Sequence, residues 1–206
     1  MGAQGLTSPI RADAFKKLQL NAGIFLVDID HSNITDADAM KAAIAAAITA
    51  GTNILGVTRG GGVFTVQREI RQVDADGVRY DFVGQDIVDK IIAFLTGTLL
   101  EVNPTNFKRL LATGDVVTTG KKTVVTMHTA IDPETDYIEH LCWVGDLADG
   151  GLVMIELDNA FNTSDFSLTF ADKNEGTMPF EFHARQGDVS DYDEAPFRVI
   201  FLDKAS

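Results

Sequence analysis

Two acidic motifs in this chain have the residue types of metal or phosphate sites. Asp28-Ile29-Asp30 follows an apolar segment, and a DxD after a strand can bind Mg²⁺ or accept a phosphoryl group. That chemistry normally needs a parallel α/β sheet behind it, and the sequence has too little βαβ alternation to build one. Asp74-Ala75-Asp76-Gly77 starts like a calcium loop, but its glycine stands at the fourth position rather than the sixth. We interpret the second motif as a hairpin turn.

A triple glycine, Gly60-Gly61-Gly62, is the third candidate, because glycine-rich loops can hold phosphates. A P-loop continues with Gly-Lys-Ser/Thr into a helix, whose N-terminal amides bind the phosphate groups. Here Val63-Phe64-Thr65-Val66 leads into a predicted strand instead. We therefore predict a hinge at the base of a hairpin and no nucleotide site.

The remaining side chains that ligate metals or attack substrates are few and scattered. Four histidines lack metal-ligand spacing on a common element: His31, His128, His140 and His183. We expect His140 and His183 at the surface or in a groove. Cys142 is the single cysteine, which excludes an internal disulfide, and its apolar surroundings make it a poor nucleophile. The sequence predicts no enzyme, with no catalytic, cofactor-binding or metal-binding residues.

The composition favours a globular protein, and the net charge favours one that does not bind nucleic acid. The chain has 206 residues, of which 45% are hydrophobic, and its formal net charge is −13. Such an acid excess repels DNA and RNA. The N-terminus has no long apolar region, and no segment reaches the roughly 18 apolar residues of a membrane span. We expect a protein that is cytoplasmic and soluble when made, with residues 1–20 as an N-terminal arm.

A strand and a helix are the first elements expected to position these motifs. The strand is predicted over residues 21–30. Thr35 or Asp36 can then cap an alanine-rich helix over residues 37–50, which stops at Gly51. One face of this helix is predicted to pack on the protein; its residues are Met40, Ala43, Ile44, Ala47 and Ile48.

A long polar hairpin is predicted around residues 60–84. Phe64, Val66 and Ile70 alternate with polar residues, the Asp74 motif turns the chain, and residues 78–83 return. The first strand carries too many polar residues for a buried central strand. We therefore predict a ribbon that protrudes and finds its partners elsewhere.

The next elements are a strand, a short helix and a series of strands. Residues 87–102 are predicted as a strand, although their apolar spacing leaves a helix open. Asn103-Pro104 starts a helix over residues 105–112. Further strands are predicted at residues 122–129, 137–145 and 152–158, with a turn at residues 149–151.

Three blocks of period-two alternation close the chain. Their apolar members are Phe166, Leu168 and Phe170, then Met178, Phe180, Phe182 and Ala184, then Phe197, Val199 and Phe201. Alternation of this kind places one set of side chains in a core and the other outside it. We interpret all three blocks as core strands. Without a repeat or a linker rich in Pro or Ser, residues 21–206 are predicted to form one mainly β domain.

The order of motifs along the chain carries a resemblance to a known family. After the first strand and the alanine-rich helix come Gly60-Gly61-Gly62-Val63-Phe64-Thr65-Val66, Glu69-Ile70-Arg71, Asp76-Gly77-Val78-Arg79-Tyr80, Thr98-Leu99-Leu100-Glu101-Val102, Asn103-Pro104-Thr105-Asn106-Phe107-Lys108-Arg109-Leu110-Leu111, Ala171-Asp172-Lys173-Asn174-Glu175, Met178-Pro179-Phe180-Glu181-Phe182-His183-Ala184 and Pro196-Phe197-Arg198-Val199. From about residue 21 onward this series resembles the major tail tube proteins of long-tailed, siphovirus-like bacteriophages.

The resemblance implies a β-sandwich or barrel of packed antiparallel sheets with one or two flanking α-helices. It also implies hexameric rings that stack into a hollow tube for DNA delivery, with tape-measure and tail-terminator proteins as partners. The location would be the virion tail, after synthesis in the host cytoplasm. The acidic charge fits a conduit that DNA crosses without specific binding, and we expect acidic residues among the polar positions that line the channel.

In that family an arm and a long hairpin bridge neighbouring subunits or rings. The candidate contact residues here are Gly60, Gly61, Gly62, Thr65, Gln67, Glu69, Arg71, Asp74, Asp76 and Gly77. The helix over residues 37–51 is a departure from the family pattern. Two alternatives are a tube protein of a contractile injection or type VI secretion system, and a β-sandwich binding module on a virion surface.

Overall fold

Alternating apolar residues fold most of this chain into antiparallel strands, over the residues 14–188 and 193–205 that the computed structural model describes. The strands are β1 (Gln19–Val27), β2 (Thr58–Gln72), β3 (Asp86–Leu99), β4 (Gly114–Thr119), β5 (Lys122–Met127), β6 (Ile138–Leu147), β7 (Leu152–Asn162), β8 (Thr169–Ala171), β9 (Asn174–His183) and β10 (Phe197–Leu202). The helices are α1 (Ala37–Ala50) and α2 (Pro104–Leu111), with 3-10 turns at Ala14–Lys17 and His31–Asn33. The predicted arm, residues 1–20, lies mostly outside the described residues.

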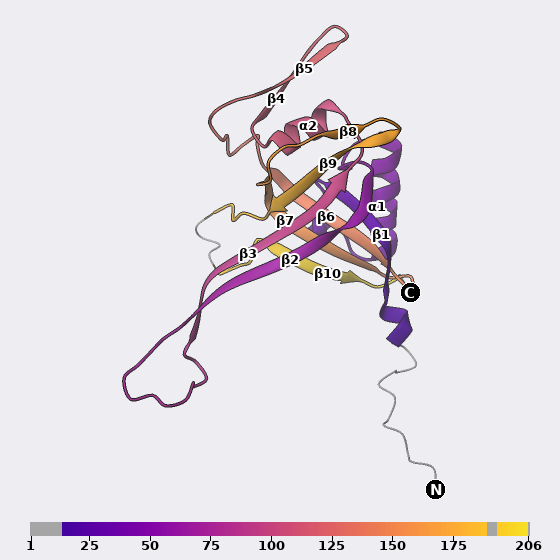
Figure 1. Ribbon diagram of the computed structural model, residues 1–206. Coiled ribbons are helices and arrows are strands. Elements are labelled where there is room, and N and C mark those ends of the chain that lie inside the picture. The colour runs from indigo at the N-terminus through magenta and orange to yellow at the C-terminus, as the bar shows by residue number, and fades with distance from the viewer. Residues whose placement is uncertain (1–13, 189–192, 206) are drawn as a thin grey trace.

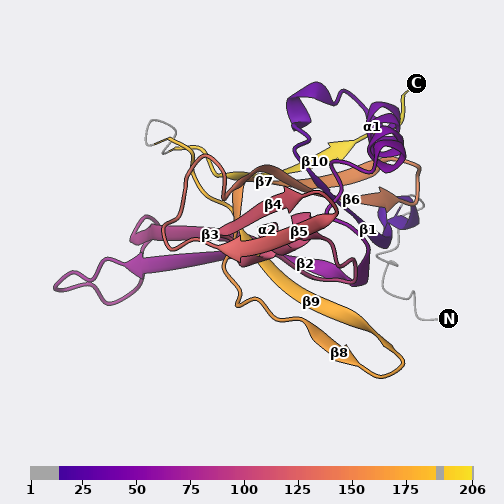
Figure 2. The ribbon, with the colours of Figure 1, turned by 90° about the horizontal axis from the view of Figure 1, so that it is seen from above.

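Eight strands form one antiparallel sheet that folds over on itself. They follow the order β1, β6, β7, β9, β3, β2, with β10 beside β7 and β8 beside β9. The sheet turns at the end of β7, where Phe161 and Asn162 pair with His183 and Phe182 of β9. One layer therefore holds β1, β6, β7 and β10, and the other holds β8, β9, β3 and β2 (Figure 1, Figure 2). The expected mainly β sandwich with flanking helices is confirmed.

The main core lies between the two layers. Met178, Phe180 and Phe182 of β9 are all buried, as their alternation predicts. Phe25 of β1 meets Phe180 edge to face, with ring centroids 5.3 Å apart. Gly97 pairs with Phe180 across β3 and β9, and a Cβ at Gly97 would lie 2.5 Å from the phenyl ring. A glycine is thus required for the two aromatic side chains to pack inside the sandwich.

Helix α1 covers the outer face of the layer that contains β6 and β7. Asp36 caps it by accepting a hydrogen bond from the Ala39 amide at 2.8 Å, and Gly51 ends it with a left-handed φ of 65°. Met40 and Ala47 are buried against this sheet, in agreement with the predicted face. Ile48, predicted on the same face, is 58% exposed and is not among the residues that pack in this cluster.

Helix α2 lies across one end of the sandwich, and a separate hairpin of β4 and β5 projects beyond it (Figure 1). Asn103 caps the helix by accepting a hydrogen bond from the Asn106 amide at 2.8 Å. Leu110 is buried, and Phe107 contacts Phe166 at 5.0 Å between ring centroids. Strand β5 was predicted, whereas β4 was not. Neither helix in the described part of the chain has the length and apolar character needed to cross a bilayer.

Several predicted strands differ from the structure. The return strand expected at residues 78–83 is wrong, because that segment belongs to a loop and β3 begins at Asp86. Residues 87–102 do form a strand rather than a helix, although β3 ends at Leu99. Of the first alternating block only residues 169–170 lie in a strand, and Phe170 is exposed.

The last block is also not a uniform core strand. Val199 and Phe201 pair with Ile155 and Val153 of β7, so they share the side of the sheet that faces the other layer. Only Phe197 reaches that core, where its ring lies 5.7 Å from Phe64. Val199 and Phe201 are 45% and 69% exposed, because the second layer does not extend over them. Period-two alternation separates two faces but does not say which of them is covered.

Candidate assembly interface

The outer halves of β2 and β3 leave the body of the molecule as a two-stranded ribbon (Figure 1). We define the ribbon as residues 66–91, which include the loop at residues 73–85. Every residue in it is exposed except Gln85, which is half-buried. The predicted protruding hairpin is therefore present, and its return strand comes from β3.

Cross-strand pairs hold the ribbon in register. Gln72 pairs with Asp86 at its outer end, and a register shift follows Glu69. Arg71 donates to both carboxylate oxygens of Asp89, from Nε at 3.0 Å and from Nη2 at 3.3 Å. In the loop the Val73 amide donates to the Gln85 carbonyl at 2.9 Å. The ribbon is thus an ordered hairpin supported by its own polar contacts.

Apolar side chains gather on this ribbon without cover. Ten of the 25 large apolar side chains that are exposed in the described part of the chain lie between residues 66 and 91. Tyr80 and Phe82 in the loop are 79% and 61% exposed, and Ile70 and Val88 form an exposed pair across the strands. Exposed apolar groups rimmed by charged residues are typical of surfaces that bind another protein.

The candidate contact residues fall in two places. Seven lie on or at the edge of the ribbon, where Thr65 is half-buried and the others are exposed: Thr65, Gln67, Glu69, Arg71, Asp74, Asp76 and Gly77. Gly60, Gly61 and Gly62 lie in the body, at the base of the ribbon. A Cβ at Gly62 would be 2.6 Å from the Thr96 carbonyl oxygen and 2.7 Å from the Phe25 ring. That glycine lets β1 approach β2 closely.

Sequence reasoning missed a second exposed apolar surface, beside the open edge of β10. Val199 and Phe201 lie there, on the side of the sheet that faces the other layer, at a place that the other layer does not cover. Within the described residues β10 pairs only with β7, so its other edge presents free backbone groups. The signal was the alternation itself, which we assigned to the core.

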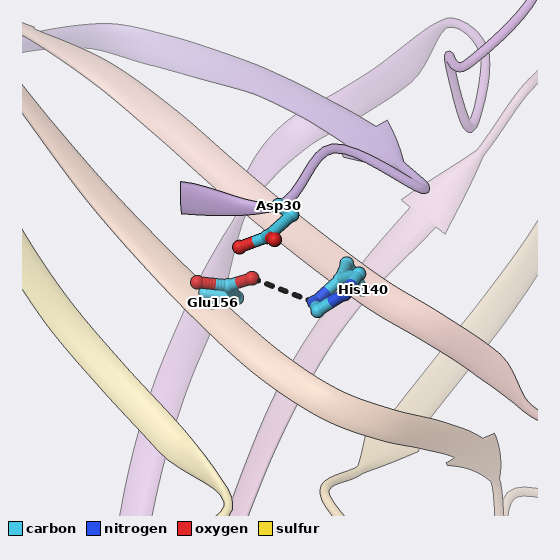
Figure 3. Close-up of side chains that lie close together, drawn as sticks. All are labelled: Asp30, His140 and Glu156. Atoms are coloured by element: carbon cyan, nitrogen blue, oxygen red, sulfur yellow. Dashed lines mark ion pairs between the residues drawn. The ribbon is translucent and has the colours of Figure 1, made fainter. Parts of the chain in front are cut away.

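A cluster of side chains that can ligate a metal was missed as a set, although Asp30 was considered within its DxD motif and His140 among the scattered histidines (Figure 3). Asp30 follows β1, while His140 and Glu156 lie on the adjacent strands β6 and β7, and ligand atoms of all three lie within 4.8 Å of one another. The predicted turn at residues 149–151 sets the register of the hairpin formed by β6 and β7. From that register His140 and Glu156 could have been identified as diagonal neighbours on adjacent strands. The position of Asp30 depends on the path of a loop and has no such signal.

Cys142 is buried beside this cluster and donates a hydrogen bond to the Ile29 carbonyl at 3.2 Å. Burial, with a smaller contribution from the Glu156 carboxylate, raises the pKa of its thiol far above the ordinary value. The thiolate form that a nucleophile needs is therefore suppressed. This agrees with its interpretation as a core residue.

A scan against protein-family models finds no match for this chain, and a search of curated proteins finds no similar one.

Proposed function

We propose that this chain is a structural subunit that assembles with its own copies into rings, and that stacked rings form the hollow tail tube of a long-tailed bacteriophage. The observation that supports this most is the ribbon of residues 66–91. It carries exposed apolar side chains on an ordered hairpin that stands away from the body. A monomer gains nothing from such a surface, whereas a neighbouring subunit can bury it.

Open strand edges support association between copies. Strand β2 stands at one end of the sheet order, and β10 has a free edge beside exposed Val199 and Phe201. Strand β1 stands at the other end, where residues 53–55 cover part of its edge. Uncovered edges favour uncontrolled strand pairing, and closure into a ring removes them. The number of six subunits and the partners, tape-measure and tail-terminator proteins, rest on the resemblance to tail tube proteins.

The charge of the chain supports a conduit for DNA. A net charge of −13 makes contact with phosphate unfavourable on average, so that DNA would pass without being held. We place acidic side chains among the residues that line the channel. A reconstruction of the tube with a mainly basic channel would contradict this part of the proposal.

Negative-stain electron microscopy and sedimentation velocity of purified protein at rising concentration test the proposal. Hollow rings or tubes are expected. Monomers or trimers at every concentration and salt condition would contradict it and would favour the binding-module alternative. A tube protein of a contractile injection system would also form rings. A gene for a sheath protein beside the gene for this chain would favour that alternative.

A further inference from the structure

Glu156 places a carboxylate inside the protein without an ordinary partner for its charge. Its side chain is fully buried on β7, beneath the loop that connects β1 to α1. Its direct neighbours in the sheet are Cys142 on β6 and Arg198 on β10. Arg198, however, donates to both oxygens of Asp158, at 2.9 and 2.7 Å. A buried carboxylate is costly unless a cation or hydrogen bonds compensate it.

Two imidazoles approach Glu156 but do not hydrogen-bond to it. His31 Nδ1 lies 2.7 Å from Oε2, and His140 Nδ1 lies 2.8 Å from Oε1. Among the described residues none of these four atoms has a partner in hydrogen-bonding geometry. Each Nδ1 atom is therefore close to a Glu156 oxygen, but its N–H or lone pair does not point at that oxygen. An ion between His140 and Glu156 would give these atoms the partner that they lack.

Asp30 supplies a second carboxylate at the same place. Figure 3 shows its side chain turned toward Glu156 and His140 from the loop above the sheet. The Ser32 amide donates a hydrogen bond to Asp30 Oδ1 at 2.8 Å, and the Ser32 hydroxyl donates one to Oδ2. Each Asp30 oxygen retains a lone pair beyond the one that Ser32 occupies. The cluster thus offers two carboxylates and one imidazole nitrogen.

We propose that Asp30, His140 and Glu156 bind a divalent transition-metal ion, and that Zn²⁺ is the ion their chemistry fits best. One imidazole and two carboxylates suit zinc. Bonds of about 2.1 Å in a tetrahedral site separate the ligand atoms by about 3.4 Å. His140 Nδ1 and Glu156 Oε1 are 2.8 Å apart, so these two atoms would move apart by about 0.6 Å when the ion binds.

The surroundings leave access and support for such an ion. A surface pocket of about 390 Å³ is lined by Asp30, His31 and His140, and it gives a route from solvent and room for a water ligand. His31 Nδ1 lies 2.7 Å from the second oxygen of Glu156, close enough to donate a hydrogen bond to it once the ion has oriented the carboxylate. The ion would join the loop before α1 to β6 and β7, and would thereby fix α1 on the sheet.

Isothermal titration calorimetry with ZnCl₂ on tag-free, chelator-treated and dialysed protein tests the site. We expect one ion per chain with a Kd in the micromolar range or below, and a rise in Tm with added Zn²⁺. Asp30→Asn and His140→Gln should each weaken binding by about tenfold or more. His183→Gln is the matched control, because His183 also contacts one carboxylate, Glu181, at 2.7 Å on a strand outside the cluster. It should leave the affinity unchanged.

Three results would overturn the proposal. They are a wild-type Kd for Zn²⁺ of a millimolar or weaker, an equal loss of affinity in His183→Gln, or an unchanged affinity in Asp30→Asn. The last variant lies in a loop, so it carries the test if His140→Gln fails to fold. Zinc binding is measured on the unassembled chain, so the result does not depend on whether the protein forms rings.

Discussion

The inner and outer halves of β3 have similar apolar residues and opposite surroundings. In the body, Ala93 and Leu95 are 4% and 2% exposed, whereas Ile91 and Val88 on the same strand are 50% and 49% exposed. The inner half is covered by the second layer of the sandwich, and the outer half pairs only with β2. The difference shows that the apolar character of this strand continues beyond what the chain itself can cover. We attribute the outer half to contacts with neighbouring copies.

The first prediction separates the two regions by their contribution to stability. Phe180→Ala should lower the free energy of unfolding by about 3–5 kcal/mol, because it opens a cavity where Phe180 meets Phe25 and Phe182. Phe82→Ala, in the exposed loop, should change it by about 0.5 kcal/mol or less. Urea unfolding followed by circular dichroism measures both. Equal losses would show that the ribbon packs on the body in solution.

A smaller effect is expected for Gly97→Ala in the core. The added methyl group would lie 2.5 Å from the Phe180 ring, which must move. Overpacking of this kind costs about 1–3 kcal/mol. Thermal unfolding of the variant gives the value, and combining it with Phe180→Ala provides the control, since removal of the ring should relieve most of the penalty. An unrelieved penalty would place the strain elsewhere.

Local signals in the sequence predicted the parts of the fold that depend on local chemistry. Asp36 and Gly51 fixed the ends of α1, and the alternation of residues 178–184 identified the buried face of β9. The ribbon was predicted from its polar strand, although its return strand was placed too early. Turn residues at 74–77 indicated a bend, whereas the length of the loop depends on the pairing of Gln72 with Asp86.

What the sequence did not predict depends on long-range placement. Val199 and Phe201 were assigned to the core because alternation does not report where the second layer ends. The cluster around Glu156 joins two strands and a loop, and the burial of that carboxylate follows from the packing of the β1–α1 loop over the sheet. The spacing of motifs along the chain predicts neither the extent of the second layer nor the burial of Glu156.

The hairpin of β4 and β5 is a second projection, and a titratable contact joins its base to the body. His128 Nε2 lies 2.9 Å from Asp136 and Nδ1 lies 3.1 Å from Asp115, and the hydrogen bond with Asp136 is the main cause of a raised pKa for His128. The folded protein therefore holds the proton more tightly than the unfolded chain. This contribution to stability is complete below the unfolded pKa of about 6.5 and is lost as the pH rises through the folded pKa.

We expect Tm to respond to this titration in the wild type and not in His128→Gln. The difference in Tm between the two proteins should be largest near about pH 5.5 and smaller near about pH 8.5. Scanning calorimetry over that range measures it, and His183→Gln serves as the control histidine. A difference that grows with pH would reverse the assigned sign.

The smallest effect is expected on the ribbon itself. Arg71 and Asp89 form an exposed ion pair across its strands, with Nε and Oδ2 3.0 Å apart. A double-mutant cycle of Arg71→Ala and Asp89→Ala should give a coupling energy of about 0–1 kcal/mol that decreases with salt. A coupling well above that range in the unassembled chain would indicate that the ribbon is already buried.

The most direct test of the account replaces the ribbon loop and measures assembly. Because the Val73 amide donates to the Gln85 carbonyl, Asn-Gly in place of residues 74–84 can close the hairpin with a two-residue turn. Val117→Ser, at an exposed site on the β4–β5 hairpin, is the control. Sedimentation velocity should then show the loop variant as a monomer with a wild-type Tm, while the wild type and the control form rings. Rings of unchanged size and yield from the loop variant would contradict the central claim that the ribbon holds neighbouring subunits together.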